Sequence, residues 1–360
     1  MLTIKTEYPD GKNDLSELVL FKDQVYDYRA IRWPADLQHD MALLTGESAG
    51  CEDRTFRPIL VRDGADILAC AVAVLDARYA RHWNERLGHI IWFEARPGTR
   101  DAVRLLMDEA CDWLKGQGAQ AARTGCGLGV TDTAFAVDDY ESLPPVGLRQ
   151  NPSHYHSLLK DAGFETERGW VDYKIQVTPE LTARYESALE ATRRAGFEIV
   201  PMRQIPEKRR IPQFTDTFND TFRFHWGFPP FTEGEFSEVF SQFDSLGIND
   251  LSVIAYRGGD PVGMLIVGAE ATADAVMRPP RTVQDSERLN FLGIGVRSSY
   301  RGRGVNLAMA AYSYLELIRR GATWLSYTLV LDDNWPSRRT GERLGAKVCA
   351  NYVTYRRNFR

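Results

Sequence analysis

The segment from Leu289 to Val305 contains the residue types best suited to binding a charged group. It begins as an apolar, strand-like run and turns at Arg301-Gly302-Arg303-Gly304. A helical pattern follows the turn, because apolar residues there recur at helix spacing. Glycines let backbone N–H groups approach a phosphate closely, and the first turn of a helix adds unpaired donors and the positive end of its dipole. We therefore predict a site here for a phosphate-bearing cofactor.

The composition is that of an ordinary globular protein. Of 360 residues, 44% are hydrophobic and 26% are charged, and 44 Lys and Arg stand against 49 Asp and Glu, giving a net charge of −5. This balance argues against a general nucleic-acid or membrane-surface binder. The sequence contains no run of 18 apolar residues, so no transmembrane helix is expected. The five cysteines are scattered without a Cys-x-x-Cys pair, so neither a disulfide framework nor a zinc site is expected, and a reducing cytoplasm fits best.

The elements that must position the turn recur in both halves of the chain. Each half contains a hairpin, a strand, a helix, a strand, a short helix and a closing strand. In the first half the expected elements are strands 58–62, 66–75 and 89–95, helix 100–115, helix 155–161 and strand 170–177. In the second half they are helices 180–194, 206–222 and 232–243, strands 197–202, 251–257 and 261–268, a loop at 271–286, strand 324–331, helix 337–344 and strand 346–356. We interpret this as a duplicated fold with domains at 1–178 and 179–360.

The two copies differ at the turn. Where the second half has its glycine-rich turn, the first has Ala95-Arg96-Pro97-Gly98-Thr99. Pro97 has no N–H group to donate to a phosphate. We therefore expect the first domain to lack the cofactor loop.

The second half resembles the GNAT superfamily of acyl-CoA-dependent N-acyltransferases. The family's loop, Arg/Gln-x-x-Gly-x-Gly/Ala, matches Arg301 to Val305, with Asn306 in place of the final small residue. Downstream, 332–334 and 344–346 fit its "Asn, short helix, Leu-Gly-Phe" segment. The first half resembles the family more faintly, and His225 to Phe228 and the Asn-Pro-x-x-Tyr segment at Asn151 fit a less-studied tandem subgroup. The resemblance implies an α/β fold of two tandem GNAT-like domains, each a mixed, twisted sheet flanked by helices.

The same resemblance implies how the cofactor is bound. Backbone amides of the turn would hold the pyrophosphate of acetyl-CoA or a longer acyl-CoA. The preceding strand would pair with the pantetheine arm and direct an amide at the thioester carbonyl, where it stabilises the oxyanion. The residues assigned to this site are Ile294, Gly295, Val296, Arg301, Gly302, Arg303, Gly304, Val305, Asn306 and Asn334.

Catalytic residues are less clearly marked. Many GNAT enzymes carry a proton-donating tyrosine at the position of Gly341. Asp332 and Tyr327, on the strand before the short helix, and His225, near the expected acceptor pocket, are the candidate replacements. Each has a structural alternative: Asp332 as a helix cap with Asp333 and Asn334, Tyr327 as a core residue, and His225 as a hydrogen-bonded structural histidine.

The expected activity is transfer of an acyl group to a primary amine, on a small molecule, a lipid or a peptide, by direct attack on the thioester. The alternatives are a non-catalytic CoA-binding scaffold and an enzyme whose donor is acyl carrier protein.

Arginines around the turn (Arg297, Arg301, Arg303, Arg338 and Arg339) fit cofactor phosphates, and no nucleic-acid-binding motif is present. His154 and His156 have no third ligand, so we expect no metal.

Aromatic residues at 222, 224, 226, 228 and 231 form either a core corner or an apolar pocket wall. A ligand pocket is built mostly from such side chains, and so is a packed core. The sequence leaves the two interpretations open.

Overall fold

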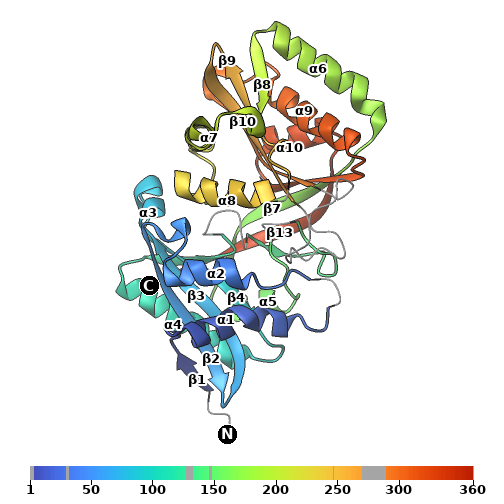
Figure 1. The fold of residues 1–360 in the computed structure, drawn as a ribbon. Helices are drawn as coiled ribbons and strands as arrows, with labels where there is room; N and C mark the ends of the chain where they lie inside the picture. The colour runs from blue at the N-terminus through green and yellow to red at the C-terminus, as the bar shows by residue number, and fades with distance from the viewer. Residues whose placement is uncertain are drawn as a thin grey trace. The chain divides into compact units, whose positions relative to one another are not determined.

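The computed structural model describes residues 4–29, 32–126, 133–145, 148–245, 247–269 and 289–359. The expected loop at 271–286 lies outside this part of the chain. The fold is mixed α/β, and the chain divides into two compact units (Figure 1). Unit 1 comprises Met1–Trp170, Gly227–Pro230 and Asn351–Arg360, and unit 2 comprises Val171–Trp226 and Phe231–Ala350.

Unit 1 is built on strands in the order β1-β2-β3-β4-β5-β13, with the short strand β6 pairing with β13. Its strands are β1 (Ile4–Glu7), β2 (Arg54–Asp63), β3 (Asp66–Asp76), β4 (Leu87–Ala95), β5 (Ala121–Thr124), β6 (Phe135–Ala136) and part of β13 (Lys347–Asn358). Its helices are α1 (Lys12–Val25), α2 (Leu37–Thr45), η1 (Ala49–Cys51), α3 (Ala77–Trp83), α4 (Arg100–Gly116) and α5 (Tyr155–Asp161).

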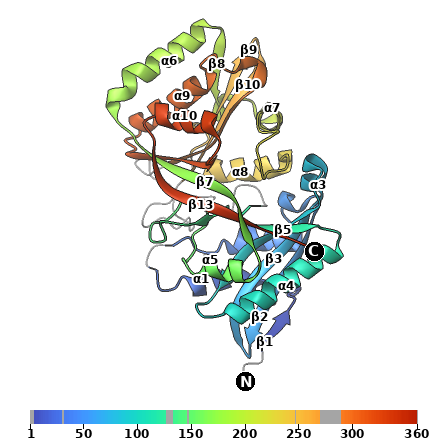
Figure 2. The same cartoon turned by 180° about the vertical axis from the view of Figure 1, so that it is seen from behind.

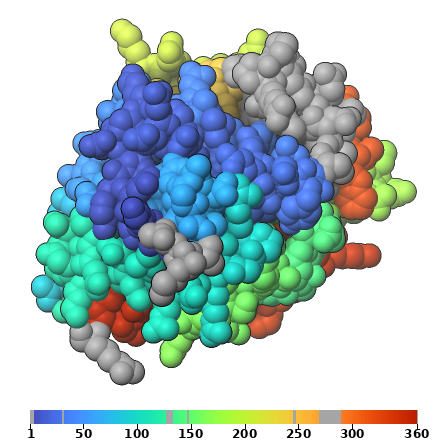
Figure 3. All heavy atoms as spheres, turned by 90° about the horizontal axis from the view of Figure 1, so that it is seen from below, coloured from blue at the N-terminus to red at the C-terminus, as the bar shows by residue number. Residues whose placement is uncertain are grey.

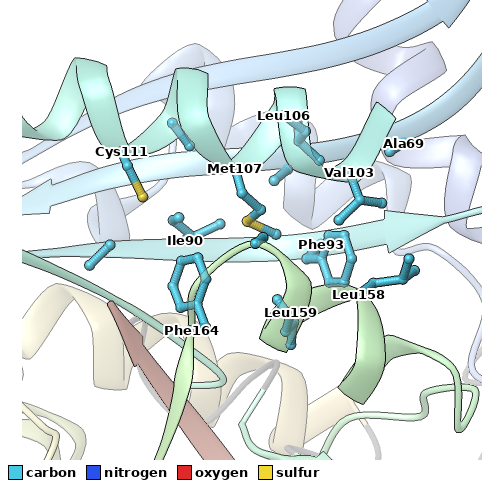
Figure 4. Close-up of a cluster of buried hydrophobic side chains, with 14 of the residues drawn as sticks. Ala69, Ile90, Phe93, Val103, Leu106, Met107, Cys111, Leu158, Leu159 and Phe164 are labelled. Atoms are coloured by element: carbon cyan, nitrogen blue, oxygen red, sulfur yellow. The ribbon is translucent and has the colours of Figure 1, made fainter. Parts of the chain in front are cut away.

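Helices cover both faces of the unit 1 sheet. Alternate residues of a strand point to opposite faces, so Ile59 and Val61 pack with α4 and α5, whereas Leu60 packs with α1 and α2. Figure 1 shows α1 and α2 on the near side of the strands, and Figure 2 shows α4 and α5 on the other side. Figure 3 shows the N-terminal segment (blue) and the α4 region (teal) at the surface of this unit. In the α4 core, Met107 lies over Phe93 and Ile90 (Figure 4).

A buried histidine makes the stability of unit 1 depend on pH. His89 on β4 is 0% exposed, and its Nδ1 lies 2.9 Å from the carbonyl oxygen of Cys126. Burial, aided by the nearby positive charge of Arg123, lowers the pKa of His89 from 6.5 to about 4. The unfolded chain therefore binds this proton first as the pH falls. Stability is fully present above the unfolded pKa and is lost between the unfolded and the folded pKa.

We expect urea unfolding to show a loss of roughly 3 kcal/mol from this histidine between about pH 7 and about pH 4. In His89→Asn the decline with falling pH should be shallower. It should not vanish, because burial also lowers the pKa of His154 and His156 in the same unit. An equal decline in the variant and the parent protein would contradict the assignment.

Unit 2 is built on strands in the order β7-β12-β11-β10-β9-β8. Its strands are part of β7 (Glu165–Gln176), β8 (Phe197–Pro201), β9 (Val253–Arg257), β10 (Asp260–Ala269), β11 (Leu289–Val296) and β12 (Trp324–Leu331). Its helices are η2 (Pro179–Leu181), α6 (Thr182–Arg194), η3 (Met202–Gln204), α7 (Glu207–Thr221), α8 (Glu233–Ser245), η4 (Ser298–Tyr300), α9 (Val305–Arg319) and α10 (Trp335–Arg343).

The two faces of the unit 2 sheet are covered by different helices. A Cβ atom added to Gly263 would lie 3.1 Å from Met309 of α9, so this residue faces α9. A Cβ atom on Gly295 would lie 2.4 Å from Oγ1 of Thr221 at the end of α7. The close approach of α7 to β11 therefore requires glycine at position 295.

Two strands run across the limit between the units. β7 leaves unit 1 after Trp170 and continues in unit 2, and β13 leaves unit 2 after Ala350 and continues in unit 1. Each unit thus contains a strand segment that belongs, in chain order, to the other half. The division into copies at 1–178 and 179–360 remains a prediction, because the compact units do not follow chain order.

Most of the expected elements are present. Helix α5 and strand β12 have the predicted limits, and α4 and β10 extend the predicted ranges by one or two residues. Among the described residues, α1, α2 and α3 were not predicted, because helices with weak apolar periodicity give little sequence signal. The 3.6-residue apolar pattern of α4 identified that helix directly.

Candidate functional site

Strands β11 and β12 separate partway along their length. Their parallel pairing has three pairs and ends at Phe291 and Tyr327. On its other side β11 stays paired with β10 as far as Val296, which lies opposite Gly263. The β12-facing edge of the segment Ile294–Val296 therefore has no strand partner in the described part of the chain. We call this opening the fork. Its unpaired backbone groups can bind an extended ligand as an added strand would.

Local irregularities in both strands produce the fork. The β10–β11 register shifts so that Leu292 is an extra residue between the pairs of Phe291 and Gly293. Such a bulge bends a strand and increases its twist. On β12, Leu329 has a φ of 57°, which is unusual for a bulky residue. This left-handed residue comes two positions after the last paired residue, where β12 departs from β11.

The glycine-rich turn lies between the fork and helix α9. Gly302 and Gly304 have φ values of 75° and 79°, in the left-handed region that favours glycine. Gly304 is the N-cap of α9, and no side chain caps this helix. The first intrahelical bond runs from Ala308 N to Gly304 O at 3.0 Å. The first-turn N–H groups are therefore available to an anion, together with the positive end of the helix dipole.

The arginines around the turn have different partners. Arg297 forms ion pairs with Asp216 and Asp220 of α7, so its charge is already balanced. Arg301 donates from Nε to the carbonyl oxygen of Val296 at 3.0 Å, which fixes the turn to the end of β11. In the described residues, no carboxylate lies within ion-pair distance of the other loop arginines, which are Arg301, Arg303, Arg338 and Arg339. These four supply the positive potential beside the turn.

Asn306 joins the turn to α10, and Asn334 begins that helix. Asn306 donates from Nδ2 to Oγ1 of Thr340 at 3.4 Å, so its side chain is directed at α10. Asn334 is the N-cap of α10, where its Oδ1 accepts from the backbone N–H of Ser337 at 3.3 Å. The side chain of Asp332 is exposed, and its carbonyl oxygen accepts from Arg338 at 2.7 Å. Asn334 thus performs the capping role that was the structural alternative for Asp332.

Tyr327 fills the space next to Gly341. A Cβ atom at position 341 would lie 3.0 Å from the Tyr327 ring, so a larger side chain there would require the ring to shift. The Tyr327 hydroxyl forms a short hydrogen bond with Oγ of Ser337 on α10. Burial raises the pKa of Tyr327 to about 12, with a smaller opposing effect of the Ser337 hydrogen bond. The phenol therefore stays protonated near neutral pH.

His225 lies just beyond the C-terminus of α7. Its ring packs edge-on against Phe222 at 5.5 Å between centroids. Burial lowers its pKa to about 4, so the imidazole is neutral at pH 7 and is a weak base. A general base works best with a pKa near the operating pH. This environment favours the structural interpretation of His225.

The segment following His225 belongs to unit 1. The carbonyl oxygen of Gly227 accepts from Cys126 Sγ at 3.4 Å, and that of Phe228 accepts from Trp83 Nε1 at 3.0 Å. Gly227 has a φ of 92°, and a Cβ atom there would lie 2.8 Å from Cys126 Sγ. The expected aromatic cluster is therefore divided, since Phe228 lies in unit 1 and Phe224 is 85% exposed.

Unit 1 has a related fork that its own side chains fill. The β4–β5 pairing ends at Ile90 and Thr124. Beyond it, the Tyr155 hydroxyl accepts from the backbone N–H of Ala95 at 2.7 Å and donates to Glu94 at 2.8 Å. Arg149 forms a buried ion pair with the same carboxylate at 3.0 Å. Protein groups therefore already satisfy the Ala95 N–H group and occupy this end of β4.

The described residues include no group of three or more His, Cys, Asp or Glu side chains that could hold a metal ion. His156 uses both ring nitrogens, with Tyr355 at 2.6 Å and Ala136 O at 2.7 Å. All five cysteines are free. Within the ranges that the structure covers, every helix is too short or too polar to cross a bilayer.

Comparison with known proteins supports the fold. No family model matches the sequence. Protein YghO of Escherichia coli (strain K12) is 22% identical over 369 aligned positions, covering 96% of this chain and 93% of that protein. A tandem GNAT protein from the clavulanic acid biosynthesis pathway superposes over 99% of this chain and 98% of its own, with a TM-score of 0.60 and 10% identity.

Two further structures are similar. A GCN5-related N-acetyltransferase from Sphaerobacter thermophilus matches with a TM-score of 0.56 and 15% identity over 99% of this chain and 96% of its own. The GCN5-related glucosamine N-acetyltransferase region of a fungal multi-domain GH3 beta-N-acetylglucosaminidase matches with a TM-score of 0.62 and 15% identity. The match covers 99% of this chain and 38% of that longer chain. The fold of this chain is therefore that of a tandem GNAT-superfamily protein, as the sequence predicted.

The structure also reveals polar residues that the sequence did not single out. Ser337 is the partner of Tyr327, and Asp172 on β7 is 1% exposed. Asp172 carries no motif, and only its place between Val171 and Tyr173 on β7 could have drawn attention to it.

Proposed function

We propose that unit 2 binds an acyl-CoA and transfers its acyl group to a primary amine. One observation carries the proposal: the edge of β11 without a strand partner leads through the short helix η4 into a glycine turn and an uncapped helix N-terminus. The fork suits the extended, amide-containing pantetheine arm, and the turn suits its pyrophosphate. No other described segment combines both features, since protein groups fill the unit 1 fork.

The residues present fit this ligand. Backbone N–H groups from Gly302 to Asn306 would hold the pyrophosphate, with Arg301 and Arg303 beside them. A side chain at Gly302 would meet no atom within 4 Å, so the turn is open. Ile294, Gly295 and Val296 would bind the pantetheine arm along the fork, and Asn334 would lie beside it. Bound acyl-CoA supplies a thioester, whose carbonyl carbon is the electrophile.

Backbone N–H groups of Ile294–Val296 would stabilise the negative charge that develops on the carbonyl oxygen. The amine nitrogen forms a bond to the carbonyl carbon and loses one proton to water. The carbon–sulfur bond breaks, its electron pair goes to sulfur, and the thiolate takes up a proton. Among the described residues, no cysteine or serine stands in an activated nucleophile setting, so direct attack on the thioester is proposed.

Tyr327, with Ser337, would protonate the thiolate in place of the family's helix tyrosine. Tyr327→Phe should lower kcat by about a hundredfold with little change in KM for acyl-CoA, since general acids contribute on that scale. Because its pKa of about 12 keeps Tyr327 protonated, kcat should not fall between about pH 7 and about pH 10.

Tyr173→Phe is the matched control for that variant. Tyr173 neighbours Tyr327 at 6.1 Å between ring centroids, and its hydroxyl accepts from Arg338 Nε at 3.0 Å. Tyr173→Phe should change kcat by less than about twofold. It also removes a phenol oxygen next to α10, but it leaves the proposed proton donor, Tyr327, in place. Equal losses in both variants would assign Tyr327 a packing role. Asp332→Ala and His225→Ala test the remaining candidates in the same assay.

The activity itself is tested with acetyl-CoA and a long-chain acyl-CoA, a panel of small, peptide and lipid amines, and two readouts. Thermal stabilisation reports binding, and release of free thiol reports transfer. Stabilisation without thiol release from any amine would indicate a CoA-binding scaffold. No response to either CoA, with transfer from an acyl carrier protein, would indicate the carrier-protein donor.

A further inference from the structure

The four glycines of strands β10 and β11 differ in the space beside them. At three of them an added Cβ atom would approach another atom to within 3.0 Å, so neighbouring groups already fill that space: Gly263, Gly268 and Gly295. At Gly293 the same atom would lie 3.3 Å from Ile266 and 3.6 Å from the rings of both Phe218 and Phe222. Carbon atoms in contact are about 3.5 to 4.0 Å apart, so these side chains leave room beside Gly293 for one methyl group. We call this space the Gly293 gap.

The Gly293 gap lies at the closed end of the fork. The last strand pair there joins Phe291 to Tyr327, and Gly293 comes two residues later on β11. The proposed pantetheine arm runs from the glycine-rich turn along Ile294–Val296 towards this end. Ile294 and Gly295 are partly exposed, so this segment can be reached from solvent. A thioester at the end of the arm would therefore stand beside the gap.

Aromatic side chains close the gap on the side away from β11. The ring centroids of Phe218 and Phe222, at the C-terminal end of α7, lie 4.7 Å apart. Behind them, Phe236 of α8 packs against Phe218 at 4.9 Å between centroids and is 3% exposed. Protein interiors are close-packed, so the Phe218 ring cannot retreat without displacing that core. A one-carbon group fits between β11 and the rings, and a longer chain meets them.

The opposite face of the sheet is closed at the same level. Helix α10 lies on the α9 side of the sheet, since Asn306 of α9 donates to Thr340 of α10. Tyr327 packs on this side, is 3% exposed and bonds to Ser337 of α10 through its hydroxyl. An acyl chain that turned away from the Gly293 gap would therefore meet the Tyr327 ring.

We propose that the Gly293 gap holds the methyl group of an acetyl donor, and that Phe218 and Phe222 set the upper limit of acyl length for unit 2. The inference rests on the proposed function and adds the length of the acyl group, which that function leaves open. An acetyl group has one carbon beyond its carbonyl, and the gap admits one. Further methylenes would have to displace a packed ring, which is unfavourable.

The first test compares acetyl-CoA, butyryl-CoA and octanoyl-CoA as donors, with an amine of the panel that the protein accepts and thiol release as the readout. For the parent protein, kcat/KM should favour acetyl-CoA over butyryl-CoA by at least about a hundredfold, because each added methylene that a closed pocket rejects is worth about tenfold or more. In Phe222→Ala that preference should fall by at least about tenfold, because the gap then opens beside α7.

Phe224→Ala is the matched control. It removes the same ring two residues further along the chain, where the side chain is 85% exposed. Its preference for acetyl-CoA should stay within about twofold of the parent value, because an exposed substitution away from the gap has little effect.

Gly293→Ala gives a second arm that fills the gap instead of opening it. Gly293 does not have a positive φ, and its added Cβ atom requires only a small shift of Ile266, so the fold should be retained. The kcat/KM for acetyl-CoA should fall by at least about tenfold, because the new methyl group occupies the place of the acetyl methyl. Affinity for free CoA, measured by calorimetry, should change by less than about threefold, because free CoA has no acyl group.

Three results would overturn the inference and leave the proposed function standing. They are use of butyryl-CoA or octanoyl-CoA by the parent protein as efficiently as acetyl-CoA, an unchanged preference in a folded Phe222→Ala, and full activity of Gly293→Ala with acetyl-CoA. If Phe222→Ala does not fold, the Gly293→Ala result decides. A parent protein that releases no thiol from any of the three donors with any amine would reject the proposed function and the inference together.

Discussion

Gly304→Asp should abolish CoA binding. The residue is the N-cap of α9, and aspartate is well accepted both at N-caps and in the left-handed region. A Cβ atom there would have only Thr192 Oγ1 nearby, at 3.9 Å, so the helix should remain folded. The new carboxylate would stand where the pyrophosphate binds. Two unit charges about 4 Å apart near a protein surface repel by about 4 kcal/mol, so affinity should fall on the order of a thousandfold.

Gly304→Asn is the matched control. Asparagine has nearly the same shape and also tolerates a positive φ, but it carries no charge. Its affinity for CoA, measured by calorimetry, should fall by less than about tenfold. Circular dichroism should show the same helix content in both variants. If the aspartate variant binds CoA as the parent protein does, the phosphate lies elsewhere.

The sequence predicted the turn and the elements on either side of it because local chemistry determines them. Gly302 and Gly304 adopt the left-handed conformations that their type allows, and β11 and α9 have strong apolar patterns. The same reasoning identified Pro97 as a sign that the first copy lacks the loop. The fork of unit 1, between β4 and β5, is filled by Tyr155 and Arg149. That filling depends on residues distant in sequence, so no local pattern could reveal it.

The polar groups of the fork could not be predicted in the same way. Whether Tyr327 is core or catalytic depends on its contact with Gly341 and its bond to Ser337, and both arise from the packing of α10 on β12. Asp172 lies 118 residues before Asn290 in the chain, and only the strand order β7-β12-β11 brings their strands together. Strand order is a tertiary property that periodicity does not encode.

The sequence also did not predict that β7 and β13 each contribute residues to both units. This arrangement affects stability. The last residues of the chain complete the sheet of unit 1. Tyr355 pairs with Thr124 of β5 and is 2% exposed, and Tyr352 pairs with Ala136 of β6 and is 3% exposed. Arg356 also contacts Glu85 at 2.6 Å and Glu167 at 3.2 Å.

Deleting residues 351–360 should therefore unfold unit 1. Loss of the burial of Tyr352, Val353 and Tyr355 alone removes roughly 5 to 9 kcal/mol. That loss is comparable with the whole stability of a typical domain, which is about 5 to 15 kcal/mol. The deletion also exposes the edge of β5, whose unpaired backbone groups promote aggregation. Thermal melts should lose a cooperative transition, and limited proteolysis should cut within 4–126.

Arg357→Ala is the control for the loss of charge at this end of the chain. Arg357 pairs with Asp108 at 2.7 Å, but both side chains are partly exposed, at 29% and 43%. Such a pair contributes at most about 1 kcal/mol, so this variant should melt close to the parent protein. If the deletion variant melts at the same temperature as the point variant, β13 contributes little to the stability of unit 1. If it melts far lower, a strand supplied from the far end of the chain holds unit 1 together.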